Sequence, residues 1–332
     1  MRKLKVLAVT SWGGACGIAN YAQMLQEAIE PLDVEVIPDS AALDPHHPSI
    51  LSLRHDGASG IDVLWLNYHA GLHSRWTPYV VAATAERTQL PIVITYHDTY
   101  RENTEQVKQL ADIADVFIVH EPVTDLPQAR LIRQGIPRPE RPSNSIRRYL
   151  AYPGQPILGT AGFDFPWKNY DRLAEVTATA GWALMIASHN LTRDRRDQIQ
   201  AINPYALFPQ MWRTGGASFF NTQEIVSWLS GCTTTAWMYE CANAGTSGAI
   251  RLGIAAMRPL AALRSCRQFR DLMEPGLLRD SWIDTWGDLE AQLTHGFSAS
   301  GMINHASAAL YATDSWGEQA KKYAAVFREV VA

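Results

Sequence analysis

Short apolar runs rich in β-branched residues alternate with segments of helical spacing along almost the whole chain. In the first half, the runs that predict strands lie at 5–9, 34–37, 61–66, 92–96 and 116–119. Between them, residues 17–29 and 103–114 have the spacing of amphipathic helices. Nearly continuous apolar strands separated by helices are typical of a parallel sheet that is covered on both faces. The alternation therefore predicts an α/β fold.

A stretch rich in proline and glycine, 134–155, divides the chain and has the composition of a connector. After it the alternation resumes, with strands expected at 157–159, 183–187, 234–237 and 259–263 and helices at 170–180, 193–202, 223–229, 248–257 and 316–331. A length of 332 residues suits about two domains. We expect Rossmann-like domains at 1–150 and 151–315, a final helix at 316–332, and a ligand cleft between the carboxyl ends of the two sets of strands.

Net charge, the lengths of the apolar runs and the spacing of the cysteines disfavour several classes of protein. A net charge of −4 provides no overall basic field that would attract nucleic acid or an anionic membrane. The apolar runs are too short for a membrane span, and the apolar part of the N-terminus is too short for a signal peptide. Cys16, Cys232, Cys241 and Cys266 are widely scattered, which is typical of reduced thiols. We therefore expect a cytoplasmic protein without a membrane span.

Three strand-to-helix turns carry candidate ligand groups. Gly13 and Gly14 follow the first strand, although their spacing does not match a G-x-G-x-x-G motif. Lys168 lies in the turn after the strand at 157–159, where a lysine can meet a phosphate as a point charge. Ser247 and Gly248 open a helix that has Arg251 one turn in, an arrangement that suits an anion. Each turn also has a plainer interpretation, a tight turn or a solvated helix start, and neither Lys168 nor Arg251 is expected in a core.

His97 ends the strand at 92–96 and is expected to project into the cleft, where it could exchange a proton or hold a sugar hydroxyl. A structural histidine bonded to the backbone is the alternative. His69 and His73 have i,i+4 spacing but flank Gly71, which disfavours a metal pair. Six arginines crowd 130–148, either as a solvated linker or as a surface for an anionic acceptor: Arg130, Arg133, Arg138, Arg141, Arg147 and Arg148.

Taken in order, these pieces resemble two-domain glycosyltransferases of the GT-B type, and retaining family 4 in particular. The resemblance spans nearly the whole chain. It rests on the Gly13-Gly14 loop, the segment 94–99 around His97, the segment 168–173, the helix start at 247–252 with its continuation at 255–260, and the final helix from Trp316.

The resemblance implies that the second domain binds a nucleotide-sugar such as a UDP- or GDP-sugar as co-substrate, with no further cofactor and no metal. Lys168, Ser247, Gly248 and Arg251 would contact its diphosphate. Gly13 and Gly14 would lie across the cleft, His97 would lie near the transferred sugar, and the final helix would pack on the first domain. His97, Lys168 and Arg251 are the catalytic candidates.

The sequence departs from the family at two places. Leu252 or Gly253 and Ala244 or Gly245 occupy the positions of the family's paired glutamates, and Phe163 stands where an arginine is common. Sugar transfer with retention, to a glycan or another hydroxyl, is the leading hypothesis. The alternatives are an inactive nucleotide- or carbohydrate-binding subunit, a nucleotide-sugar epimerase and an NAD-dependent oxidoreductase, for which Asp39 is the candidate acidic residue. A modified base in nucleic acid is the second option for the acceptor, because of the arginine-rich connector.

Overall fold

The structure is a computed structural model. It describes residues 2–12, 17–39, 60–69, 77–97, 105–123, 126, 128–139, 146–150, 152–209, 221–240, 246–273, 278–295 and 300–332. The chain divides into two compact units. Unit 1 contains Met1–Gly135, Ala244–Thr246 and Trp316–Ala332, and unit 2 contains Ile136–Asn243 and Ser247–Ser315. The first division therefore falls at Gly135, so that 136–150, which we expected in the first domain, belong to unit 2.

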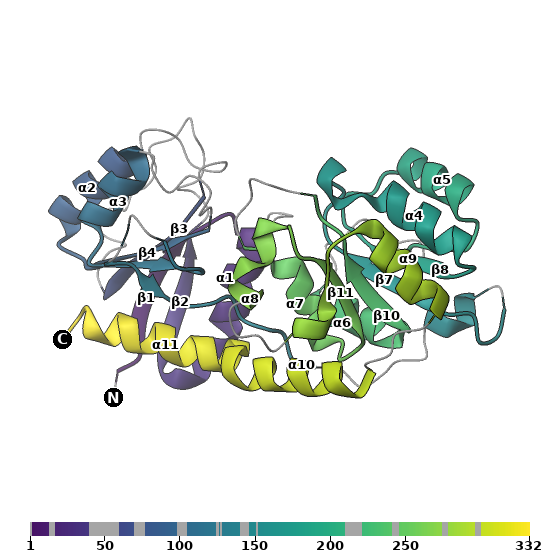
Figure 1. Ribbon diagram of the computed structural model, residues 1–332. Helices are drawn as coiled ribbons and strands as arrows, with labels where there is room; N and C mark the ends of the chain where they lie inside the picture. The colour runs from purple at the N-terminus through teal and green to yellow at the C-terminus, as the bar shows by residue number, and fades with distance from the viewer. Residues whose placement is uncertain are drawn as a thin grey trace. The chain divides into compact units, whose positions relative to one another are not determined.

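Unit 1 is built on a parallel sheet with the strand order β2-β1-β3-β4-β5-β6, of which Figure 1 labels β1 to β4. Its strands are β1 (Leu4–Val9), β2 (Val34–Asp39), β3 (Val63–Tyr68), β4 (Ile92–Tyr96), β5 (Val116–Val119) and β6 (Arg130–Leu131). Its helices are α1 (Gly17–Ile29), α2 (Thr77–Thr88), α3 (Glu105–Ile113) and α11 (Trp316–Glu329). Because β1 lies between β2 and β3, the chain reverses its direction of travel across the sheet at β1.

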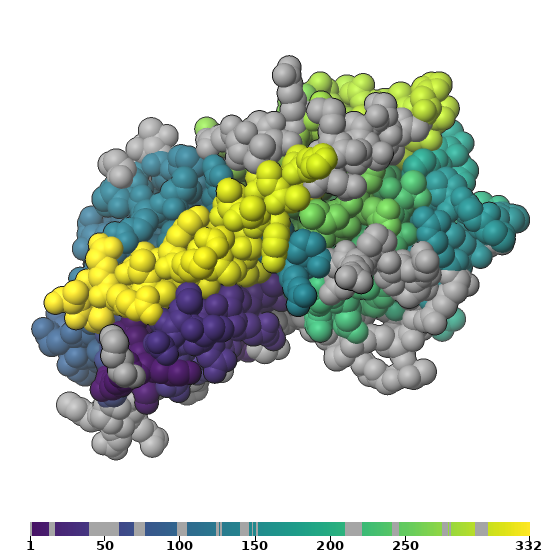
Figure 2. All heavy atoms as spheres, turned by 90° about the horizontal axis from the view of Figure 1, so that it is seen from below, coloured from purple at the N-terminus to yellow at the C-terminus, as the bar shows by residue number. Residues whose placement is uncertain are grey.

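Two cores cover the two faces of the unit 1 sheet. Side chains of α1 and α11 pack on one face, and side chains of α2 and α3 pack on the other. Figure 2 shows α11 lying along the N-terminal elements, and the Tyr21 and Tyr323 hydroxyls, 2.7 Å apart, join α11 to α1. The last helix of the chain therefore completes the sheet packing of the first unit.

Unit 2 repeats this plan with the strand order β12-β11-β10-β7-β8-β9, again with parallel pairing throughout. Its strands are β7 (Ile157–Ala161), β8 (Ala183–Ala187), β9 (Ala206–Leu207), β10 (Thr234–Trp237), β11 (Leu260–Leu263) and β12 (Trp282–Ile283). Its helices are α4 (Tyr170–Thr179), α5 (Arg193–Ile202), α6 (Thr222–Gly231), α7 (Gly248–Ala255), α8 (Arg270–Met273), α9 (Trp286–His295) and α10 (Ser300–Asp314). Helices α4, α5 and α9 cover one face, and α6, α7, α8 and α10 cover the other.

These two sheets confirm the predicted α/β fold class. The short edge strands β6, β9 and β12 and the helices α2, α8, α9 and α10 were not predicted. None of the helices within the described ranges is both long and apolar enough to cross a bilayer. Cys232 and Cys266, the two cysteines that the structure describes, are buried free thiols.

Close packing of α7 on the unit 2 sheet depends on one glycine. A Cβ at Gly253 would clash with the ring of Trp237, which is fully buried at the end of β10. We predict that Gly253→Ala lowers the free energy of unfolding by about 1–3 kcal/mol, because an added methyl must displace a packed ring. Gly287→Ala is the control, since a Cβ there has an ordinary contact of 3.6 Å with Thr285. Urea unfolding of both variants measures the difference, and equal stabilities would contradict this packing.

Candidate functional site in unit 2

The reversal of strand order in unit 2 lies between β7 and β10. Strands β8 and β9 extend the sheet on one side of β7, whereas β10, β11 and β12 extend it on the other. In open α/β sheets, ligands bind beyond the carboxyl ends of the strands at such a point. The two segments that emerge here are 162–169, which follows β7, and 238–240, which follows β10. They form the candidate site.

Hydrogen bonds join these two segments to each other. The side chain of Asn169 donates to the carbonyl oxygens of Trp167 at 3.2 Å and Met238 at 3.1 Å. The backbone N–H of Glu240 donates to the carbonyl of Trp167 at 2.9 Å. Asn169 has a positive φ of 55°, which is tolerated best by glycine and asparagine, and it turns the chain from a short 3₁₀ helix (Pro166–Lys168) into α4. These bonds thus fix the backbone on both sides of Lys168.

Lys168 is buried in this turn, with 6% of its surface exposed. Its ammonium lies 5.0 Å from the ring centre of Tyr239 and 5.9 Å from that of Phe165. Among the described residues it has no hydrogen-bond acceptor and no ion-pair partner, so aromatic rings provide its close contacts. Burial lowers the pKa of Lys168 from 10.5 to about 7, and the negative charge of Asp164 acts in the opposite direction. The expectation that Lys168 lies outside a core is therefore wrong.

Gly162 makes room for this ammonium. Its φ of +122° is a conformation that other residues rarely adopt, and a Cβ there would clash with the Lys168 Nζ. The same Cβ would lie 3.5 Å from the Cβ of Ala249, in the first turn of α7. The Lys168 ammonium and the start of α7 therefore approach the same point at the end of β7.

The start of α7 provides backbone donors at this point. Ser247 is the N-cap residue, and its side chain does not cap the helix. The first N–H groups of a helix lack acceptors within the helix and favour an anion. The structure thus brings the first turn of α7, which follows Ser247 and begins at Gly248, close to Lys168. Their contact with a diphosphate stays a prediction.

Arg251 lies on α7 but is directed into the interior, with 2% of its surface exposed. It donates to the carbonyl oxygen of Ser247 at 2.8 Å and forms an ion pair with Asp271 of α8. The expectation that this side chain lies outside a core is wrong, because these contacts make it an internal support for the helix start. A direct contact between Arg251 and a phosphate stays a prediction.

His97 belongs to unit 1, where it follows β4, and it is 7% exposed. Its Nε2 lies 3.0 Å from Asn67 Oδ1, and its Nδ1 lies 3.1 Å from His120 Nε2. His120 Nδ1 lies 2.8 Å from the carbonyl oxygen of Ile132, to which it must donate. Both ring nitrogens of His97 are thus engaged within unit 1, and its role near a transferred sugar stays a prediction. Gly13 and Gly14 lie outside the described residues.

Four groups were not identified from the sequence: Tyr239 and Asp164, which act on Lys168, Arg195, which pairs with Asp164, and Asp271, which pairs with Arg251. Tyr239 could have been found, because it follows a predicted strand. The partners Arg195 and Asp271 are set by tertiary packing and have no signal in the local sequence. Within the described ranges, no three His, Cys, Asp or Glu side chains gather as a metal site would require.

Burial of Lys168 predicts a pH-dependent stability difference. Because its folded pKa of about 7 lies below its unfolded value of 10.5, the unfolded state binds more protons between these values, and stability rises with pH across that window. We predict that Lys168→Met stabilises the ligand-free protein most below pH 7, and that this advantage shrinks as the pH approaches 10. Urea unfolding of both proteins from pH 6 to pH 10 measures it. An advantage that does not depend on pH would contradict the burial of a charged amine.

The Arg251–Asp271 pair predicts a large loss of stability on truncation. We expect Arg251→Ala to lower the free energy of unfolding by about 3–5 kcal/mol, because Asp271 keeps a buried charge that has lost its partner. Arg264→Ala is the matched control, since Arg264 pairs with Asp284 at 2.8 Å on the surface, with 53% and 68% of the two side chains exposed. That change should cost less than about 1 kcal/mol. Similar losses in the two variants, measured by urea unfolding, would show that the buried pair is not a support.

Solved structures of other proteins share this architecture. No protein-family model matches the sequence, and no curated protein matches it either. Solved structures do match, over nearly the full length of both chains. HepE of Anabaena, solved in complex with UDP and glucose, superposes with a TM-score of 0.71 at 13% identity and covers 98% of this chain and 100% of its own.

Two further structures have similar extents. The lipopolysaccharide outer core galactosyltransferase WaaB has a TM-score of 0.59 at 11% identity, over 98% of this chain and 100% of its own. An α-glucosyltransferase, in complex with UDP and a DNA 13-mer containing an HMU base, has a TM-score of 0.60 at 10% identity, over 99% and 100%. At such identities the likeness shows the fold, and that fold is the GT-B type that the sequence resembles.

Proposed function

We propose that this protein is a glycosyltransferase, a hexosyl- or pentosyltransferase, that uses a nucleoside diphosphate sugar as donor and binds its diphosphate beside Lys168. The observation that carries the proposal is the Lys168 ammonium, which is buried at the strand-order reversal without an acid partner among the described residues. A buried cation needs a counter-charge, and the start of α7 beside Gly162 adds donors for the same anion. The neighbours solved with UDP support this class of donor.

The geometry suits a reaction in which negative charge grows on the diphosphate as the bond to the sugar breaks. A cation held in place by packing stabilises this charge more in the transition state than in the ground state. We propose that Lys168 acts in this way, that Arg251 supports the α7 start from within, and that no metal is required. We also propose transfer with retention, which NMR of the anomeric proton of the first-formed product tests.

For the acceptor we propose a glycan hydroxyl, with His97 near the transferred sugar. A base in nucleic acid is the second option, and one neighbour was solved with DNA that contains an HMU base. Of the arginines at 130–148, Arg130 forms two hydrogen bonds with Glu329, at 2.7 and 2.8 Å, so its charge is already matched within unit 1. This pairing favours the glycan. Salt-dependent DNA binding that is lost on neutralising Arg147 and Arg148 would favour the nucleic acid instead.

A binding protein without turnover is the second candidate function. Leu252, at a position where the resembling family has a glutamate, is 9% exposed and packs in a core, so it offers no carboxylate. Release of free sugar from UDP-glucose, GDP-mannose and ADP-glucose separates the two functions, because a binding protein would raise the melting temperature with one of them but would release nothing. The scattered cysteines, two of them described as buried free thiols, support a reducing cytoplasmic location.

The proposal predicts a linked proton. The diphosphate of UDP-glucose has no proton to lose near neutral pH, so binding to the charged form of Lys168 requires proton uptake wherever the free amine is neutral. We predict that UDP-glucose affinity is constant below pH 7 and falls above it by up to about tenfold per pH unit. Calorimetry at pH 8 in buffers of different ionisation enthalpy should show uptake of nearly one proton.

Lys168→Met should remove the proton uptake and lower kcat/KM by about 10²–10³. Lys321→Ala is the control, because Lys321 is exposed and pairs with Glu318 on α11. Near-normal turnover of the Lys168→Met variant would contradict the proposed donor site. Binding without any proton uptake in the unmodified protein would do so as well.

A further inference from the structure

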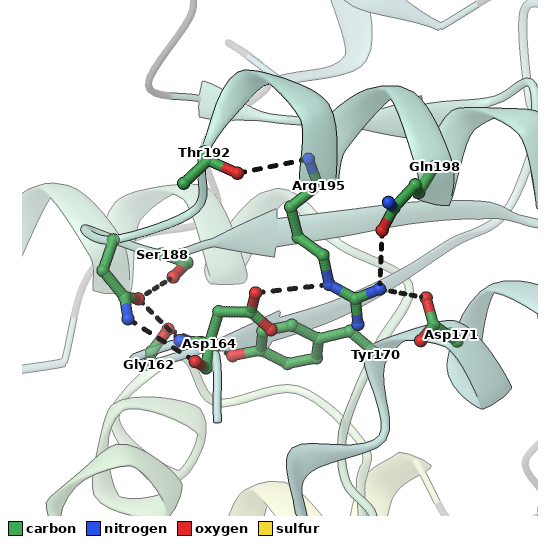
Figure 3. Close-up of polar contacts among 9 residues, drawn as sticks. Gly162, Asp164, Tyr170, Asp171, Ser188, Thr192, Arg195 and Gln198 are labelled. Atoms are coloured by element: carbon green, nitrogen blue, oxygen red, sulfur yellow. Dashed lines mark hydrogen bonds and ion pairs between the residues drawn. The ribbon is translucent and has the colours of Figure 1, made fainter. Parts of the chain in front are cut away.

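Arg195 of α5 lies between two acidic side chains next to the candidate site (Figure 3). Its Nε donates to Asp164 Oδ2 at 3.2 Å, and its Nη1 donates to Asp171 Oδ1 at 2.7 Å. The Arg195 and Asp164 side chains are 24% and 19% exposed, whereas that of Asp171 is 48% exposed. The α5 helix start is itself fixed by Thr192, whose side chain accepts from the backbone N–H of Arg195. The cluster therefore connects α5 to the turn that follows β7.

The backbone around Asp164 is held from the same side. Its N–H donates to Asn190 Oδ1 at 2.6 Å, and the Ser188 hydroxyl donates to the same oxygen at 3.1 Å. The Tyr170 hydroxyl donates to the carbonyl oxygen of Gly162 at 3.0 Å. The first residues after β7 are thus bonded to the segment after β8 and to α4. These contacts determine where the turn presents Lys168.

The charge of Asp164 reaches the Lys168 amine without a direct ion pair. It opposes the effect of burial and raises the pKa of Lys168, and it also raises that of Tyr170. Asp171 pairs with the same arginine but is not among the groups that act on Lys168. The charge of Asp164 therefore raises the pKa of Lys168, whereas the charge of Asp171 does not.

The other groups around Lys168 supply no competing negative charge among the described residues. Burial raises the pKa of Tyr239 and Tyr170 far above neutrality, so both hydroxyls are uncharged. Glu240 accepts from the Trp286 indole at 2.7 Å and pairs with Arg172 at 3.5 Å. Arg251 of α7 and Asp271 of α8 neutralise each other.

We propose that Asp164, clamped by Arg195, is a positioning residue for Lys168. Its bonds fix the turn that carries the amine, and its carboxylate supplies the negative charge that keeps the buried amine protonated before a phosphate arrives. The inference rests on the proposed function for its ligand, but the electrostatic link between the two residues can be tested without any ligand.

The test is a pH titration of the ligand-free protein with ¹³Cε-labelled lysine, followed by NMR. The chain has six lysines, Lys3, Lys5, Lys108, Lys168, Lys321 and Lys322, so the spectrum has few signals, and Lys168→Met assigns the one that matters. We expect the Lys168 signal to titrate near pH 7. Asp164→Asn should lower that midpoint by about 1 pH unit, because a nearby opposite charge is lost. Asp171→Asn, the matched control, should leave it in place.

A purely structural role for Asp164 gives the opposite sign. Loosening the turn would hydrate the amine, and hydration would raise the midpoint toward 10.5. An unchanged or raised midpoint in Asp164→Asn therefore overturns the proposal. If Asp164→Asn does not fold, Asp164→Ser serves instead, because it removes the same charge and should also lower the midpoint, and an unchanged or raised midpoint would again overturn the proposal.

UDP-glucose binding then separates this inference from the proposed function. Asp164→Asn should weaken binding at pH 8 by up to about tenfold and leave binding at pH 5 nearly unchanged, because with midpoints of about 7 and about 6 the amine is largely protonated at pH 5 in both proteins. If the unmodified protein binds none of UDP-glucose, GDP-mannose and ADP-glucose at either pH, the proposed function fails, while the NMR midpoints still decide the role of Asp164. Equal weakening at both pH values would overturn the electrostatic role.

Discussion

Burial of the Lys168 amine, which has no acid partner among the described residues, costs free energy. Several groups of unit 2 accommodate this buried amine. A glycine with a left-handed φ leaves the space, the faces of two aromatic rings contact the ammonium, and a carboxylate acts on it from the same turn. None of these groups neutralises the amine through a direct ion pair. Below pH 7 the amine is therefore charged and an incoming anion can pair with it, which is a property expected of a preorganised phosphate site.

Other contacts in unit 2 fix the positions of Lys168 and of the first turn of α7. The ends of β7 and β10 lie next to each other at the point where the strand order reverses. Hydrogen bonds of Asn169 and Glu240 connect the segments that follow these two strands. Helix α7 packs closely enough to present its first turn because Gly253 has no side chain against Trp237, and the Arg251–Asp271 pair supports that turn from within. Arg251 thus contributes through the fold, whereas the Lys168 ammonium lies beside Gly162 at the end of β7.

Periodicity was sufficient for the long elements, because helices such as α4 and α11 bury one stripe and strands such as β3 and β8 bury both faces. It failed for α2, whose β-branched Val80 and Val81 interrupt a helical pattern, for α10, which is rich in Ala and Ser, and for the two-residue edge strands. The turns that carry Lys168, Ser247 and Gly248 were predictable, because strand-to-helix turns are local in sequence. The partners Asp271, Arg195 and His120 were not, since each meets its residue through packing between elements distant in the chain.

The most direct test of the central claim is a crystal structure of the protein with UDP bound. The account predicts that the β-phosphate lies within hydrogen-bond distance of the Lys168 Nζ and against the first-turn N–H groups of α7, with Arg251 still paired to Asp271. A diphosphate bound elsewhere on unit 2, with the Lys168 ammonium still contacting only the rings of Tyr239 and Phe165, would contradict it.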